Sequence, residues 1–200
     1  MLKIYYEDDK GNKIFTPENI EDQPKGEIKF KFNGKNSFVY FGKKVQLPNA
    51  TFHLDNDCQI IIGDNSTLRG NFLALLNSSK IYIGNNTRFQ SICRVQAAEG
   101  TTVNIGKDCL FADVWFRTCD FHSIIDLDTN KRINHSADII IEDNVWIAED
   151  VRVYKGITIG HSSVIGARST VTKSLPSNTL SVGTPAKVVK ENITWSKHLL

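Results

Sequence analysis

The hydrophobic positions of this 200-residue chain are most regular near its C-terminus, where an apolar residue recurs every six positions. The recurring residues are Ile141, Ile147, Val153, Ile159, Ile165 and Val171. An α-helix would scatter them around its axis, because its period is about 3.6 residues. On an extended chain, an even spacing turns all of these side chains to the same side. The spacing therefore predicts a parallel β-helix, in which each coil covers the apolar face of the next.

Earlier segments repeat the pattern with longer coils. Ile62, Ile83 and Ile105 each precede a glycine and stand 21 and 22 residues apart. A coil of three six-residue units has about 18 residues, so we expect small bulges in these coils. The interval from Ile105 to Ile141 is 36 residues, again a multiple of six. Because a non-repetitive stretch lies within it, we expect a loop at about 120–138 that leaves the coil and returns in register.

The two ends of the chain do not follow the repeat. Residues 1–38 are polar, and we expect one or two irregular strands there as a cap over the first coil. The coils are expected over residues 39–182, and a short helix and tail over 183–200. Pro185 would lie near the first turn of that helix, at about 186–192. Together these parts are expected to form a single all-β domain over residues 1–200.

The composition of the chain limits the kinds of partner that we expect it to bind. The hydrophobic content is 40%, enough for a full core, yet no apolar run approaches the roughly 20 residues of a membrane span. The N-terminus lacks the apolar stretch of a signal peptide, so we expect a cytoplasmic protein. A net charge of +2 gives no argument for nucleic acid. The four cysteines show no zinc-site spacing and are expected to be reduced core or corner residues, with no metal.

The stretch from Ile141 to Lys190 resembles the hexapeptide-repeat acyltransferases that use acetyl-CoA. The matching pieces are Asn144-Val145-Trp146-Ile147, Lys155-Gly156-Ile157-Thr158-Ile159-Gly160, Val164-Ile165-Gly166-Ala167, Val171-Thr172-Lys173 and Gly183-Thr184-Pro185-Ala186-Lys187. The resemblance implies that the β-helix is left-handed and that acetyl-CoA is the acetyl donor. It also implies a homotrimer whose active sites lie between subunits.

A second resemblance concerns the acceptor. His122, followed 24 residues later by Trp146, resembles the maltose and galactoside O-acetyltransferases. From about Ile105 to Trp195 the chain resembles more closely the bacterial O-acetyltransferases of sialic-acid-containing capsular polysaccharide. The pieces that carry this resemblance are Asp120-Phe121-His122-Ser123-Ile124, Arg132-Ile133-Asn134-His135 and Val188-Val189-Lys190-Glu191-Asn192-Ile193-Thr194-Trp195. The implied activity is acetyl transfer to a hydroxyl of a surface polysaccharide sugar, with sialic acid as a candidate.

The resemblance assigns catalytic roles. A sugar hydroxyl is a poor nucleophile, and histidine, which titrates near neutral pH, suits the general base, so we expect His122 to take the proton. Asp120 would orient the imidazole or contact the sugar, although a turn-forming role explains it equally well. His135 is a rival base that we expect to hold the loop or line the acceptor site. Trp146 would wall the acetyl and pantetheine end of the donor or pack at a subunit interface.

The binding contacts also follow from the resemblance. The donor would lie along the later coils and the C-terminal segment, and its phosphates favour lysine. The expected cofactor-binding residues are Trp146, Ala148, Gly166, Ala167, Thr172, Lys173, Gly183, Pro185, Lys187 and Lys190. Arg117, Lys131 and Arg132 flank His122 and could bind a sugar carboxylate. The galactoside and maltose enzymes carry an acceptor-binding asparagine where an ungapped count places Ile92 here, which leaves the acceptor contacts unassigned.

Two alternatives stay open from the sequence. One keeps the fold but acetylates the amine of an amino sugar. The other is a non-catalytic or metal-dependent β-helix protein, such as one of the γ-carbonic-anhydrase type, which needs three converging histidine ligands. The five histidines of this chain show no such spacing.

Overall fold

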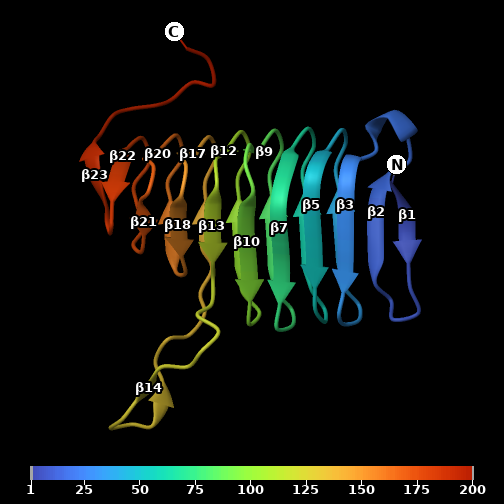
Figure 1. Cartoon of the computed structure of the whole chain (residues 1–200), viewed down its shortest axis with the longest axis horizontal. Coiled ribbons are helices and arrows are strands. Elements are labelled where there is room, and N and C mark those ends of the chain that lie inside the picture. Colours follow the sequence, from blue (N-terminus) through green and yellow to red (C-terminus); the bar gives the residue numbers. More distant parts are fainter. Residues whose placement is uncertain (1, 200) are drawn as a thin grey trace.

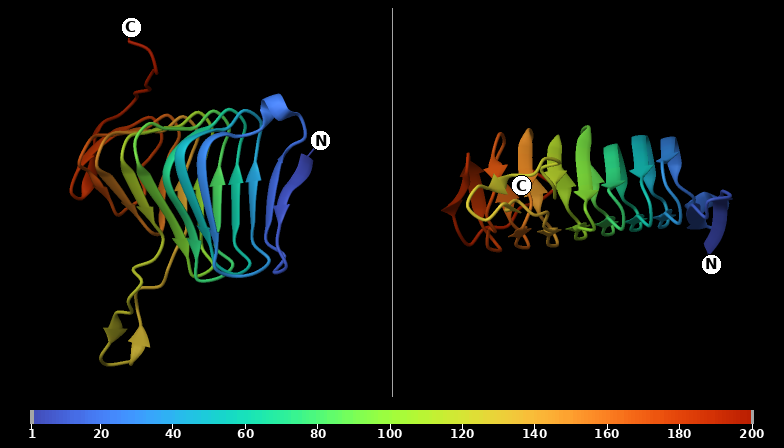
Figure 2. Two further views of the ribbon diagram at one scale, coloured as in Figure 1. Left: turned by 45° about the vertical axis from the view of Figure 1, so that its right-hand side comes forward. Right: turned by 90° about the horizontal axis from the view of Figure 1, so that it is seen from below.

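The chain winds into a stack of parallel coils whose strands lie side by side along the long axis (Figure 1, Figure 2). The structure is a computed structural model that describes residues 2–199. One side of the stack is an eight-stranded sheet in which every neighbouring pair except β1–β2 is parallel. Its strands, in spatial order, are β1 (Leu2–Glu7), β2 (Lys13–Pro17), β4 (Phe38–Phe41), β6 (Gln59–Ile62), β8 (Lys80–Ile83), β11 (Thr102–Ile105), β16 (Ile139–Ile141) and β19 (Ile157–Ile159).

A 13-stranded sheet covers the other two sides. One sheet covers two sides because β7 (Thr67–Leu75) pairs with a strand of each. Most of β7 pairs with β10 on one side, and Thr67 pairs with β9 on the other. Along one side lie β3 (Lys25–Phe32), β5 (Gln46–Leu54), β7, β10 (Cys93–Ala98), β13 (Val114–Arg117), β18 (Val151–Tyr154) and β21 (Thr170–Val171). Along the other lie β9 (Arg88–Phe89), β12 (Leu110–Phe111), β17 (Trp146–Ile147), β20 (Val164–Ile165), β22 (Leu180–Gly183) and β23 (Ala186–Lys190).

The register confirms the six-residue prediction. Ile141 pairs with Ile159, and the next two anchors of the repeat pair with their own counterparts one coil later. All six anchors are buried. Ile62, Ile83, Ile105 and Ile141 form one continuous ladder, so the 36-residue interval does return in register.

The predicted loop leaves the stack after β13 and comes back before β16. It projects away from the coils and carries a small hairpin of β14 (Ile125–Asp126) and β15 (Lys131–Arg132) (Figure 1, Figure 2). The loop closes where the Ala137 amide donates to the Thr118 carbonyl, at 3.2 Å. The stretch expected at about 120–138 is therefore confirmed as an excursion from an otherwise continuous coil.

The prediction of a C-terminal helix is wrong. Residues 186–190 form β23, which pairs antiparallel with β22. Without β23, the backbone groups of β22 would form an open sheet edge, and a helix would leave them unpaired. The adjacent Val188 and Val189 also favour extended backbone.

The N-terminal cap is smaller than expected. β2 pairs parallel with β4, and β3 pairs parallel with β5, so coil structure begins near residue 13 rather than residue 39. The antiparallel strand β1 covers the open edge of β2, and the 3-10 turn η1 (Ile20–Asp22) precedes β3. The polar sequence concealed this first coil because its outward faces are charged, as the alternating Lys29, Lys31 and inward Phe30, Phe32 show.

The structure also bears on the cysteines, on metal binding and on membrane spans. Cys58, Cys93, Cys109 and Cys119 are free thiols in the buried interior, as the sequence predicted. Between residues 2 and 199, no three His, Cys, Asp or Glu side chains are grouped to hold a metal ion. Over the same range there is no helix with the length and apolar character to cross a bilayer.

Candidate active site

The base of the loop is held by a polar network around Asp120. Its carboxylate pairs with the Lys155 ammonium and accepts a hydrogen bond of 2.8 Å from the Asn134 side chain. Burial raises the pKa of Asp120, but the hydrogen bonds from Lys155 and Asn134 outweigh it and lower that pKa overall. Asp120 is therefore an ionised anchor that connects the loop to the coil carrying Lys155.

His122 lies on the turn that this network fixes. The Asn134 amide donates to the His122 carbonyl at 2.8 Å, and its oxygen accepts from the Ile124 amide at 2.8 Å. The His122 side chain is exposed, and within residues 2–199 no group forms a hydrogen bond with its imidazole. The structure thus brings Asp120 to Lys155 and Asn134 rather than to the imidazole that it was expected to orient.

Arg132 has a carboxylate partner within the chain. Its two terminal nitrogens bond the Glu99 carboxylate at 2.8 and 2.9 Å, and the Ser136 hydroxyl donates to the same carboxylate. Mainly because of the bonds from Arg132, with a further one from Ser136, the pKa of Glu99 falls to about 2. The residue expected to bind a sugar carboxylate is thus engaged in tying the loop to the end of β10.

Arg117 lies beside the loop on the outward face of β13. Its guanidinium stands 4.5 Å from the ring centre of Trp115 and 5.6 Å from that of Phe121. The Nε atom of Arg117 is buried and has no hydrogen-bond partner among residues 2–199. Arg117 is therefore close to the turn of His122, whereas Lys131 and His135 are exposed on the returning half of the loop.

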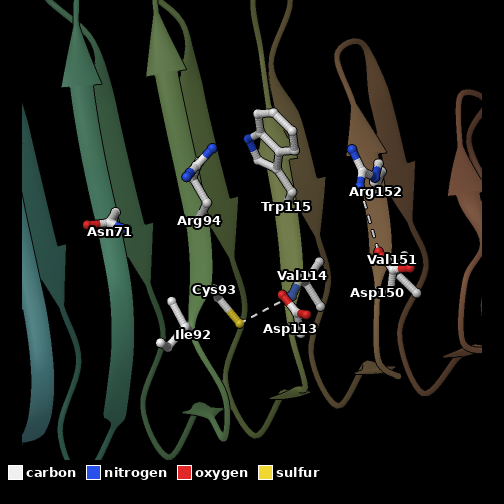
Figure 3. Close-up of a pocket in the computed structure, with 10 residues that line it drawn as sticks. All are labelled: Asn71, Ile92, Cys93, Arg94, Asp113, Val114, Trp115, Asp150, Val151 and Arg152. Carbon is white, nitrogen blue, oxygen red and sulfur yellow. Dashed lines mark hydrogen bonds and ion pairs between the residues drawn. The ribbon is translucent and has the colours of Figure 1, made fainter.

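Trp115 is the centre of a basic and aromatic face that sequence reasoning missed. Arg94 and Arg152 pair with it across the sheet and place their guanidinium groups 5.0 and 5.4 Å from its ring centre (Figure 3). A cavity of about 190 Å³ lies along this face and includes Asp113 and Asp150 at its margin. The signal was present in the sequence, because these side chains occupy matching outward positions in successive coils.

Trp146 lies elsewhere on the chain. It sits on β17 with 38% of its surface exposed, and its ring centre is 5.9 Å from that of Trp195. The Trp195 indole donates to the Asn144 carbonyl at 2.6 Å, so the tail packs back on the coil. Figure 1 shows β17 along the upper edge of the stack and the loop with β14 projecting from its lower edge. Within the chain, the strand that carries Trp146 and the projecting loop after β13 therefore lie at different edges of the stack.

The expected donor-binding residues lie along the last coils. Ala148 follows β17, Gly166 and Ala167 follow β20, and Thr172 and Lys173 follow β21. Gly183 ends β22, Pro185 lies in the turn between β22 and β23, and Lys187 and Lys190 are exposed on β23. Gly166 also has a packing reason, because a Cβ there would stand 2.6 Å from a Val182 methyl.

Comparisons with known proteins agree with this architecture. Residues 138–173 match the family described as bacterial transferase hexapeptide (six repeats). A polysialic acid O-acetyltransferase of Neisseria meningitidis is 32% identical over 169 residues, which cover 83% of this chain and 78% of that protein. A polysialic acid O-acetyltransferase of Escherichia coli O1:K1 is 38% identical over 137 residues, covering 68% of this chain but only 44% of that longer protein.

Two solved structures share the fold over most of their length. The polysialic acid O-acetyltransferase OatWY superposes with a TM-score of 0.74 and 27% identity, covering 88% of this chain and 92% of that one. The polySia-specific acetyltransferase NeuO gives a TM-score of 0.66 and 31% identity, covering 88% of this chain and 82% of that one.

Proposed function

Because this chain belongs to the hexapeptide-repeat acetyltransferases, we propose that it transfers acetyl from acetyl-CoA to a hydroxyl of a sialic-acid-containing surface polysaccharide or its sugar. The observation that carries the proposal is the similarity to a polysialic acid O-acetyltransferase over 83% of the chain. The exposed His122, on a turn fixed by charged and amide groups, supplies a group suited to the chemistry.

The proposed mechanism is direct attack. The neutral imidazole of His122 accepts the proton of the sugar hydroxyl while that oxygen attacks the thioester carbonyl. Backbone N–H groups at a coil corner would stabilise the transient oxyanion. The carbon–sulfur bond then breaks, and the imidazolium returns its proton to the CoA sulfur. The products are an acetyl ester and free CoA, with no covalent enzyme intermediate.

We propose that the active unit is a homotrimer in which His122 of one copy faces Trp146 of another. The separation of the loop from β17 within one chain supports this arrangement. The loop also exposes apolar side chains, with Leu127 95% and Ile133 60% exposed within residues 2–199. Such clusters on a projecting segment are typical of a protein–protein contact.

The donor is proposed to lie along the last coils. Lys173, Lys187 and Lys190 are exposed there and would pair with the anionic groups of CoA. Ala148, Ala167 and Thr172 present short side chains on the same coils, which leaves room for the pantetheine arm.

The test is thiol release from acetyl-CoA with a panel of acceptors: sialic acid polymers, neutral polysaccharides, simple galactosides and amino sugars. We expect release that depends on the sialic acid polymer and falls about 100-fold or more in His122→Ala. His161→Ala, an exposed histidine at a corner away from the loop, is the matched control and should retain full activity. Release that does not depend on any acceptor would overturn the transferase proposal, and full activity in His122→Ala would overturn the assignment of the base.

The chemistry of the product distinguishes O-acetylation from the N-acetylation of an amino sugar. An acetyl ester is cleaved by hydroxylamine, whereas the amide formed on an amino sugar is not. A hydroxylamine-resistant product would therefore replace the O-acetyltransferase proposal by N-acetylation.

A further inference from the structure

We propose that Asn134 is the positioning residue of His122 and that Lys155 fixes both to the β-helix. The inference rests on the proposed function, since it assigns the groups that hold its base. It concerns a residue on the returning half of the loop, 12 positions after His122 in the sequence.

The Asn134 side chain brackets His122 from both sides. Its amide nitrogen donates at 2.8 Å to the Asp120 carboxylate and at 2.8 Å to the His122 carbonyl. Its oxygen accepts from the Ile124 amide at 2.8 Å and from Arg132 Nε at 3.3 Å. Both donor hydrogens and both acceptor lone pairs of the amide are therefore used. No other amino acid of this size offers two donors and an acceptor in one plane.

Lys155 connects this bracket to the coil. It follows β18, and its ammonium pairs with Asp120 and donates to the Asn134 carbonyl at 3.0 Å. One cation thus holds the outgoing half of the loop through Asp120 and the returning half through Asn134. Movement of the His122 turn relative to the β-helix would break a charge-assisted bond at either point.

The turn needs such support because its backbone is unfavourable. Phe121, directly before His122, has a φ of 62°, in the left-handed region that bulky residues avoid. A conformation of this kind persists only where surrounding bonds fix it. The fixed turn sets the direction in which the His122 imidazole points, while the imidazole itself stays without a partner in residues 2–199.

The experiment compares Asn134→Ala with Asn104→Ala, an exposed asparagine on β11. For Asn134→Ala we expect kcat to fall about 10- to 100-fold, the range that loss of positioning produces, with KM for acetyl-CoA unchanged. Asn104→Ala should keep both constants. Unchanged kcat in a folded Asn134→Ala protein would overturn the proposal.

A second variant separates positioning from folding. Asn134→Asp keeps the shape of the side chain but can form a hydrogen bond with Asp120 only when one of the two carboxyl groups is protonated. Contact between two carboxyl groups raises the pKa of one of them above its ordinary value of about 4, so we expect the activity of this variant, relative to the wild type, to rise as the pH falls from about 7 to about 5. A ratio that does not change with pH, at an unchanged melting temperature, would contradict the proposal. Wild-type and His122→Ala proteins run alongside. Full activity in His122→Ala would overturn the base itself, whereas inactive His122→Ala together with fully active Asn134→Ala would overturn only the role of Asn134.

Discussion

At the scale of single residues, phenylalanine side chains fill the coil interior as a column of rings, in face-to-face or edge-to-face contact from one turn to the next. The ring centres of Phe52 and Phe72 are 5.4 Å apart, those of Phe72 and Phe89 5.4 Å, and those of Phe89 and Phe111 5.0 Å. All four side chains are fully buried. The six-residue spacing predicted the aliphatic anchors of the later coils, but it could not place these rings. Their coils are longer than a regular one, so the spacing between them is not constant.

Truncating a ring in the middle of this column of phenylalanine rings should destabilise the whole chain. Phe72→Ala removes contacts with rings in both neighbouring coils, and we expect a loss of about 3–5 kcal/mol in the free energy of unfolding. Urea denaturation followed by circular dichroism measures it. Ile20→Ala, at a side chain that is 78% exposed, is the control and should leave the midpoint almost unchanged. Equal midpoints for the two variants would show that the column of phenylalanine rings contributes little to the free energy of unfolding.

At the scale of elements, the bounds of the loop could be predicted but its contacts could not. The return to register between Ile105 and Ile141 defined where the coil is interrupted. Nothing in the spacing indicated that Arg132 would meet Glu99, 33 residues earlier, because such a pair depends on how the loop folds back. For the same reason, the motif that contains Asn134 did not predict its hydrogen bonds to Asp120 and His122.

The Glu99–Arg132 pair should make the order of the loop depend on pH. The pKa of Glu99 is lowered from 4.5 to about 2, so the pair stabilises the folded loop above pH 4.5, and this contribution is lost as the pH falls toward 2. We expect the protection of the Ile133 amide, which bonds the Ile124 carbonyl at 2.9 Å, to fall over that range. Hydrogen exchange, normalised to amides of the β-helix, measures it.

A substitution tests the same pair at neutral pH. Glu99→Gln should lower the protection of the Ile133 amide to the level that the wild type reaches in acid. Asp143→Asn, which removes an exposed carboxylate paired with Lys107 at 3.8 Å, should leave it unchanged. If the Glu99 variant keeps full protection, the pair does not order the loop.

At the scale of the whole molecule, the stack of coils was predictable and its two ends were not. A repeat defines how each coil lies on the next, and the register of Ile141, Ile147 and Val153 follows it. The ends lack a following coil, so local pairing decides them, as β23 shows by covering the edge of β22. The placement of β17 and of the loop with β14 at opposite edges likewise depends on coil geometry that the sequence does not spell out.

That separation leads to a prediction about assembly. If each site takes His122 from one copy and Trp146 from a neighbour, His122→Ala and Trp146→Ala chains should each be inactive alone but complement each other. Co-expression at equal levels would leave about one quarter of all sites with both residues intact, and one of the three sites, about one third, in every trimer that contains both variants, because each site draws its two residues from different chains. Thiol release by assemblies purified through a tag on each variant measures the recovery. Mixed assemblies as inactive as their parents would mean that the two residues do not meet between copies, and the shared-site arrangement would be wrong.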